Sequence, residues 1–173
     1  FLNKIKESSI TSNIELAICL VKKTPMEIIL QKATELGVNR ITPIISERTE
    51  VKELNLERAI KITVEATEQS NQLNPPVINK VTKLKDFISN INQNRNLFFA
   101  KLNSEYRLKP EEIKKNQLIS ILIGPEGDFS SQERGLILAR SNLTSFTLSR
   151  NILRTDTAVI SAISLVNFIH SDH

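Results

Sequence analysis

The stretch Leu-Ile-Ser-Ile-Leu-Ile-Gly-Pro-Glu-Gly, residues 118–127, decides the fold class. Its first six residues predict a buried strand, and two of only four glycines in the chain follow as Gly124 and Gly127. Glycine can take a positive φ or let a ligand approach the backbone closely. Ligands of open α/β sheets bind at the carboxyl ends of strands, so we expect a binding loop here. A plain tight turn over Pro-Glu-Gly-Asp explains the same pattern equally well.

The spacing of the two glycines does not match two common phosphate-binding loops. No Gly-Lys-Ser or Gly-Lys-Thr follows, as a P-loop requires, and the spacing differs from Gly-x-Gly-x-x-Gly. A capping box from Ser130 to Glu133 predicts a helix start just beyond the loop, and backbone N–H groups gather at such starts. The loop therefore suits a small polar ligand held by main-chain groups.

Strand and helix patterns alternate on both sides of this stretch. Apolar runs predict strands, and spacing of three and four predicts helices. At the first helix, Thr24 and Glu27 form a possible capping box and Gly37 a natural end. The alternation predicts an α/β domain with a mostly parallel central sheet. The predicted strands are 15–21, 40–45, 77–81, 97–101, 118–123 and 146–148, and the helices 24–36, 56–70, 84–91, 131–140 and 155–169.

Composition narrows the class of protein. The chain has 173 residues, 40% hydrophobic and 24% charged, enough for one domain. No apolar run approaches 18 residues, so we expect no membrane span. The single cysteine, Cys19, lies in an apolar run, which indicates a buried thiol and a reducing, cytoplasmic compartment. His170 and His173 stand at the very end, so we predict no metal site. A net charge of +4 is compatible with nucleic acid but common on ordinary surfaces.

Two features near the C-terminus indicate contacts beyond those of an ordinary surface helix. The last predicted helix is apolar over most of its circumference, which indicates burial on more than one side, and a subunit interface is the simplest second partner. Arg154 and Asp156 stand at the mouth of this helix. In the ordinary interpretation Thr155 or Asp156 caps the helix and Arg154 pairs with Asp156 or Glu126. In the functional interpretation Arg154 points into a site and meets an anion or a polar base.

Five stretches occur together in one order: Gln31–Gly37, Ser46–Arg48, Glu65–Gln69, Ile123–Gly127 and Ile152–Ala158. In this the chain resembles the RsmE family, ribosomal RNA methyltransferases of the SPOUT superfamily that modify nitrogen 3 of a uridine in 16S rRNA. The resemblance covers roughly residues 14–169. It implies a SPOUT α/β knot, with a mostly parallel sheet and a C-terminal deep trefoil knot, an exception to the rule that chains do not thread loops.

The resemblance also implies a cofactor, partners and roles for residues. The cofactor would be S-adenosylmethionine, and the enzyme would be a homodimer acting on 16S rRNA in the small ribosomal subunit. Residues 1–173 would form the methyltransferase domain alone, without the N-terminal PUA-like RNA-binding domain of family members. Arg154 and Glu126 would be catalytic, with Arg154 the best candidate for handling the uridine. The cofactor would contact the turn after the 97–101 strand and the residues Leu122, Ile123, Gly124, Pro125, Glu126, Gly127, Leu148, Ser149, Ile152 and Leu153.

The chain departs from the family pattern at two positions, and two other functions stay open. Ser149 stands where the family usually has Gly, and Asp156 where it has Glu. A positive φ at Ser149 would cost about 1 kcal/mol or more. The alternative functions are a SPOUT methyltransferase acting on transfer RNA and a non-catalytic RNA-binding protein that keeps the fold.

Overall fold

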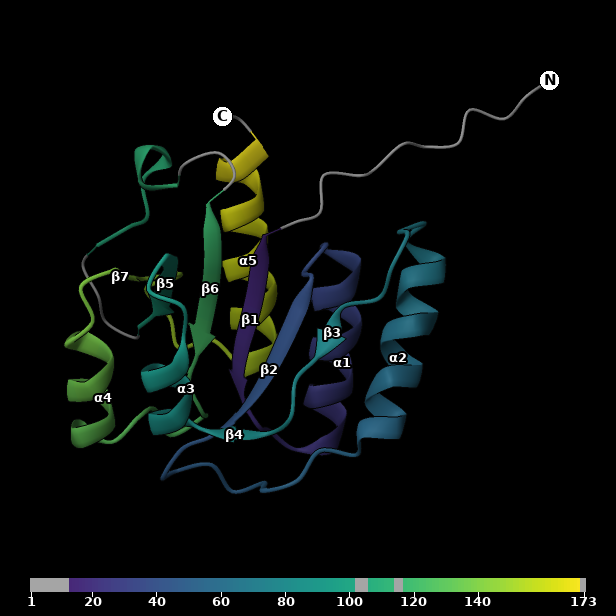
Figure 1. Cartoon of the computed structure of the whole chain (residues 1–173), viewed down its shortest axis with the longest axis horizontal. Helices are drawn as coiled ribbons and strands as arrows, with labels where there is room; N and C mark the ends of the chain where they lie inside the picture. Colours follow the sequence, from purple (N-terminus) through teal and green to yellow (C-terminus); the bar gives the residue numbers. More distant parts are fainter. Residues whose placement is uncertain (1–12, 102–105, 114–116, 172–173) are drawn as a thin grey trace.

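A computed structural model describes residues 13–101, 106–113 and 117–171 of the chain (Figure 1). Seven strands form one sheet in the described part of the chain, and its six strand pairs are parallel. The elements in chain order are β1 (Ile14–Cys19), α1 (Lys23–Glu35), β2 (Arg40–Ile45), α2 (Leu56–Gln69), β3 (Val77–Ile78), β4 (Thr82–Lys83), α3 (Leu84–Asn90), β5 (Arg95–Ala100), the 3-10 turn η1 (Pro110–Glu112), β6 (Leu118–Ile123), α4 (Ser131–Leu138), β7 (Leu143–Phe146) and α5 (Thr155–Ser171). The α/β prediction is confirmed, with β7 beginning three residues earlier than expected.

Helices cover both faces of the sheet, whose strand order is β3-β2-β1-β6-β5-β7 with β4 also paired to β2. In Figure 1, α1, α2 and α5 lie behind the sheet, and α3 and α4 lie in front of it. Alternate residues of each strand face the two layers. The core behind the sheet includes Ile14, Leu16 and Ile18, whereas Ala17 and Cys19 join the core in front. The buried central strands explain their continuous apolar runs.

The ends of α1 show one correct and one wrong prediction. The helix begins at Lys23 with Lys22 as its N-cap residue and without a side-chain capping bond. Thr24 therefore lies inside the first turn, and the predicted capping box is wrong; Glu27 pairs instead with Arg58 of α2, at 3.1 Å. The predicted end at Gly37 is confirmed, because this glycine has φ +81° and the chain reverses there.

The helix α5 crosses back from the edge strand β7 to lie against α1 and β6. One side of α5 is buried, including Val159, Ile163 and Val166. The opposite side is open in the single chain, where the Phe168 side chain is 69% exposed. Burial on a second side therefore needs another molecule, and the homodimer stays a prediction. The trefoil threading of the chain likewise stays a prediction.

A polar cluster lies near the amino ends of the central strands, on the face covered by α3. The Glu15 carboxylate accepts hydrogen bonds from Thr42 Oγ1 at 2.5 Å and Ser120 Oγ at 2.6 Å. It also lies 3.6 Å from Arg95 Nε, and burial lowers the pKa of that arginine. Glu15 therefore joins β2, β1 and β6 near the amino ends of these strands, at the end of the sheet opposite the glycine loop.

In the part of the chain that the structure describes, no helix is long and apolar enough to cross a membrane.

Candidate functional site

The carboxyl ends of β1 and β6 form the switch point of this sheet. The two strands are parallel neighbours, with Ile18 paired to Ile123. From β1 the chain continues into α1 and β2 on one side, and from β6 it continues into α4 and β7 on the other. The two connections diverge and cover opposite faces, which opens a crevice beyond the strand ends. Ligands of open α/β sheets bind in such crevices.

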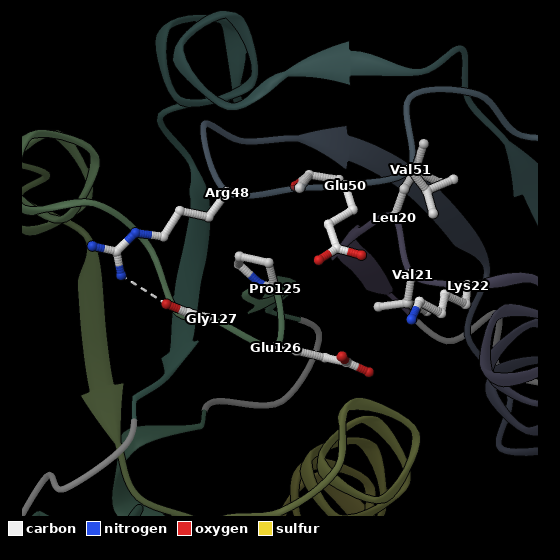
Figure 2. Close-up of a pocket in the computed structure, with 10 residues that line it drawn as sticks. Leu20, Val21, Lys22, Arg48, Glu50, Val51, Pro125, Glu126 and Gly127 are labelled. Atoms are coloured by element: carbon white, nitrogen blue, oxygen red, sulfur yellow. Dashed lines mark hydrogen bonds between the residues drawn. The ribbon is translucent and has the colours of Figure 1, made fainter.

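A cavity of about 120 Å³ occupies this crevice (Figure 2). Its walls come from three segments, one after each of β1, β2 and β6. Figure 2 shows the side chains of Lys22, Glu50 and Glu126 around the same space. Two carboxylates and an ammonium group therefore border a cavity whose apolar surface comes from residues such as Leu20, Val21 and Val51. The lining residues are Leu20, Val21, Lys22, Arg48, Thr49, Glu50, Val51, Pro125, Glu126 and Gly127.

Two hydrogen bonds lock the segment after β2 to the segment after β6. Arg48 NH1 donates to the Gly127 carbonyl oxygen at 2.7 Å (Figure 2). The Glu47 backbone N–H donates to Glu133 Oε1 at 2.8 Å. The second oxygen of Glu133 accepts from the Ser130 N–H and completes the predicted capping box, which is confirmed. Because Glu133 is buried, one carboxylate both caps α4 and fixes the opposite wall of the crevice.

The segment after β2 is itself a rigid turn. The Thr49 hydroxyl accepts from the Ser46 N–H at 3.0 Å and lies 2.8 Å from the Ser46 hydroxyl. The Cys19 thiol lies beneath this turn, and burial raises its pKa to about 12, although the two hydroxyls oppose the shift. The buried, inert cysteine predicted from the sequence is confirmed. Arg48 and Glu50 thus project from a preorganised base.

The sequence left two explanations for the Gly124–Gly127 loop open, a plain tight turn and a loop that leaves room for a ligand, and the structure has features of both. Asp128 N–H donates to the Pro125 carbonyl oxygen at 2.9 Å, so a tight turn is present. The positive φ in this turn belongs to Asp128, at 57°, and not to either glycine. A Cβ at Gly124 would lie 3.0 Å from the ring of buried Phe129, whereas one at Gly127 would meet only Arg48 Cδ at 3.8 Å. Packing of Phe129 therefore requires glycine at 124, and position 127 is left open toward the cavity.

The predicted cofactor residues have contrasting surroundings. Leu122 and Ile123 bury their side chains in the front and rear cores, so they can offer a ligand only main-chain groups. Ile152, by contrast, is 82% exposed, so its apolar side chain is open to a ligand. Ser149 accepts from the Asn151 N–H through its hydroxyl and does not have a positive φ, so the expected strain is absent. The turn predicted after the 97–101 strand includes residues outside the described part of the chain.

Arg154 lies at the start of α5, outside the cavity lining. Its side chain is 74% exposed, and its Nε lies 3.7 Å from Asp156 Oδ1. The predicted pairing with Asp156 is thus present, but an exposed pair of this kind contributes little to stability. The guanidinium group remains accessible to a ligand.

The sequence did not predict the wall of the cavity that follows β1. Leu20 and Val21 end the predicted 15–21 strand and Lys22 has no predicted role, although the pairing of β1 with β6 brings all three beside the glycine loop. A second cavity, of about 390 Å³, adjoins this wall between α1 and α2 and is mainly apolar, with Lys23 and Glu53 among its lining residues. Within the described ranges, no group of three or more His, Cys, Asp or Glu residues is placed to hold a metal ion.

A family model described as an RNA methyltransferase domain matches residues 7–167. The chain belongs to this RNA methyltransferase family. The domain is 34% identical over 170 residues to the ribosomal RNA small subunit methyltransferase E of Rickettsia conorii, which covers 97% of the chain and 69% of that protein. It is 37% identical over 150 residues to the enzyme of the same name from Aquifex aeolicus, which covers 83% of the chain and 63% of that protein. The resemblance to the RsmE family is confirmed.

Solved structures agree with the RNA methyltransferase assignment. The crystal structure of a ribosomal RNA small subunit methyltransferase E from Neisseria gonorrhoeae, bound to S-adenosyl methionine, matches with a TM-score of 0.83 and 29% identity. That match covers 91% of the domain and 66% of the Neisseria chain, so the domain spans about two thirds of the length of such relatives. The Aquifex aeolicus TrmH/SpoU tRNA modifying enzyme, at 12% identity and TM-score 0.59, shares the fold alone. The SPOUT α/β fold class is thereby confirmed.

Proposed function

We propose that this protein transfers a methyl group from S-adenosylmethionine to nitrogen 3 of a uridine in 16S rRNA. The observation that carries the proposal is the similarity, along 91% of the chain, to a methyltransferase E whose crystal structure contains S-adenosyl methionine. The uridine specificity follows the RsmE family. The match to the transfer RNA enzyme is too distant to favour that substrate.

The residues present fit this cofactor. The loop Leu148–Leu153 carries Ile152, whose exposed side chain offers an apolar wall to an adenine ring. The Gly124–Gly127 loop offers main-chain groups, and its Gly127 leaves the crevice free of a side chain. Bound S-adenosylmethionine supplies an activated methyl group on a sulfonium sulfur. The protein's own contribution is to hold the target nucleotide and to accept its proton.

Nitrogen 3 of uracil becomes nucleophilic when it loses its proton. Glu126, whose carboxylate borders the crevice, accepts this proton. The nitrogen lone pair forms the new N–C bond as the C–S bond breaks, and the electron pair of that bond stays on sulfur. Arg154 contacts the target nucleotide from the start of α5, where its guanidinium group is exposed. Placement of the two reactants contributes much of the rate.

The homodimer and the cytoplasmic location belong to the same proposal. The open side of α5, with Phe168 exposed, supports a second copy of the chain at this helix. A reduced, buried Cys19 agrees with a reducing compartment.

Calorimetry with S-adenosylmethionine and nucleoside analysis of treated rRNA test this function. We expect saturable cofactor binding and the appearance of N3-methyluridine in small subunits isolated from cells that lack the enzyme. Methylation of transfer RNA alone would favour the related SPOUT activity. Absence of cofactor binding would favour a non-catalytic RNA-binding protein.

A further inference from the structure

We infer that the 120 Å³ cavity between β1, β2 and β6 receives the uracil ring of the target nucleotide, with Lys22 donating a hydrogen bond to a ring carbonyl. The inference rests on the proposed function and adds to it a binding site for the base. It begins from the size of the cavity. Drug-sized ligands occupy roughly 300–1,000 Å³, so a cavity of about 120 Å³ suits one ring rather than the whole cofactor.

The cavity lies apart from the predicted cofactor loop Leu148–Leu153, although Pro125, Glu126 and Gly127 belong both to its lining and to the predicted cofactor site. None of the residues Leu148–Leu153 lines it, and two of its three walls follow β1 and β2. The other predicted cofactor loops follow β5 and β7, which lie beyond β6 in the strand order. The glycine loop is therefore common to both sites, which places a base in the cavity next to the methyl donor's loop. An enzyme that modifies a base must extrude it into such a pocket.

The polar groups of the cavity complement the edge of uracil. That edge presents an acceptor, a donor and an acceptor: two carbonyl oxygens on either side of the N3–H group. Lys22 offers N–H donors, and Glu126 offers an acceptor. None of the ion pairs in the described part of the chain includes Lys22, so its ammonium group is available for a ligand. Leu20, Val21 and Val51 provide apolar surface for the ring faces.

The same groups reject cytosine. Cytosine carries an amino donor where uracil carries a carbonyl acceptor, and its N3 has no proton to give. With Lys22 at the C4 carbonyl position, its ammonium group would face the amino donor of cytosine, and the Glu126 carboxylate would face the N3 lone pair. Sites built to hydrogen-bond one group reject an analogue without it by about 10⁴–10⁵-fold.

Lys22 also has a function during the reaction. As the N3 proton moves to Glu126, negative charge spreads to the ring carbonyls, and the ammonium group stabilises it. The N3–C bond forms as the C–S bond of the sulfonium breaks, the electron pair remains on sulfur, and Glu126 later releases the proton to water. The bonds of Arg48 to Gly127 and of Glu47 to Glu133 hold the walls at the spacing that the ring needs.

Single-turnover methyl transfer to unmodified small subunits tests the site, with cofactor affinity measured separately by calorimetry. We expect Lys22→Met to lower the rate by about 10²–10³-fold, the usual effect of losing one such donor, and Lys22→Arg to recover part of it. Cofactor affinity should stay within about twofold of the wild type in both variants. Lys23→Met is the matched control, because Lys23 lines only the neighbouring cavity, and it should transfer normally.

A second variant fills the cavity. Val51→Phe should abolish transfer while leaving cofactor affinity unchanged, with thermal unfolding used to check that the variant folds. If Val51→Phe lost cofactor binding, or if Lys22→Met transferred at the wild-type rate, the assignment of the cavity to the base would be wrong. A wild type that binds no cofactor would overturn the proposed function first, and this inference with it.

Discussion

The reason for glycine at position 124 can be tested by a single methyl group. A Cβ built at Gly124 would lie 3.0 Å from Phe129 Cε2 and 3.3 Å from its Cδ2, closer than the 3.5–4.0 Å of favourable carbon contacts. The Phe129 ring cannot retreat, because it is fully buried and packs against Phe99 with ring centroids 5.7 Å apart. Gly124→Ala should therefore destabilise the protein even without any ligand.

Two opposing effects set the change in the free energy of unfolding of Gly124→Ala. Overpacking of this kind costs about 1–3 kcal/mol. The φ of Gly124 is not positive, so alanine can adopt the backbone conformation and gains about 0.4–1 kcal/mol from a less flexible unfolded chain. The net loss should be about 0.5–2 kcal/mol, which for a chain of this length lowers the Tm by about 1–8 °C.

Gly127→Ala is the matched control. Its Cβ would meet only Arg48 Cδ, at an ordinary 3.8 Å, so only the unfolded-state gain remains and stability should rise slightly. Chemical denaturation of both variants, each also in a Phe129→Leu background, measures the coupling between positions 124 and 129. Equal stability of Gly124→Ala and Gly127→Ala would refute the packing argument and return Gly124 to a role in ligand approach.

Three further outcomes are expected. Glu133→Ala should lower the free energy of unfolding by about 1.5–3 kcal/mol, because the Glu47 N–H and the start of α4 lose a charged acceptor, and Glu133→Gln by less; urea denaturation checks this. The Cys19 thiol loses its proton near pH 9 when unfolded but near pH 12 when folded, so the thiol's contribution to stability is complete below pH 9 and falls above it by about 1.4 kcal/mol per pH unit. Unfolding curves between pH 9 and 11 should show this loss in the wild type relative to Cys19→Ala, and parallel curves would contradict it. Glu15→Ala should cost less than the about 3–5 kcal/mol of a broken, fully buried pair, since half-buried Arg95 loses its carboxylate partner but keeps its bond to the Ile119 carbonyl; thermal unfolding against Glu15→Gln, expected to lose less, checks it.

The elements with strong local signals were predicted well. β2 and β6 have the expected bounds, and the capping box at Ser130 begins α4 as predicted. The prediction for the start of α1 was wrong. Thr24 and Glu27 have the spacing of a capping box, but the Glu27 side chain pairs with Arg58 of α2 instead of capping the helix. Local propensity is a weak guide where a tertiary partner competes.

The site was harder to predict, because the order of strands in the sheet cannot be read from the order of elements in the chain. Residues 20–22 and 125–127 are about a hundred positions apart, and only the pairing of β1 with β6 brings them together. The stretch Ser46–Arg48 contributes to the resemblance, but the sequence predicts no role for it. Its role lies in its partners across the crevice, and a single sequence does not show those partners.

The switch point also explains why the segments around the crevice carry different kinds of residue in this chain. The glycine loop follows the central strand β6, between the proposed cofactor loop Leu148–Leu153 on one side and the cavity on the other, and Gly127 keeps its part of the crevice free of a side chain. The walls after β1 and β2 carry Lys22 and Glu50, whose side chains border the cavity and whose charges would select a ligand. Small and charged residues cannot exchange places here. A large residue at position 127 would enter the crevice, and a glycine at position 22 would leave the proposed base without a hydrogen-bond donor. The distribution of small and charged residues around the crevice is therefore a consequence of strand order, and it is the physical basis for assigning one side to the methyl donor and the other to the base.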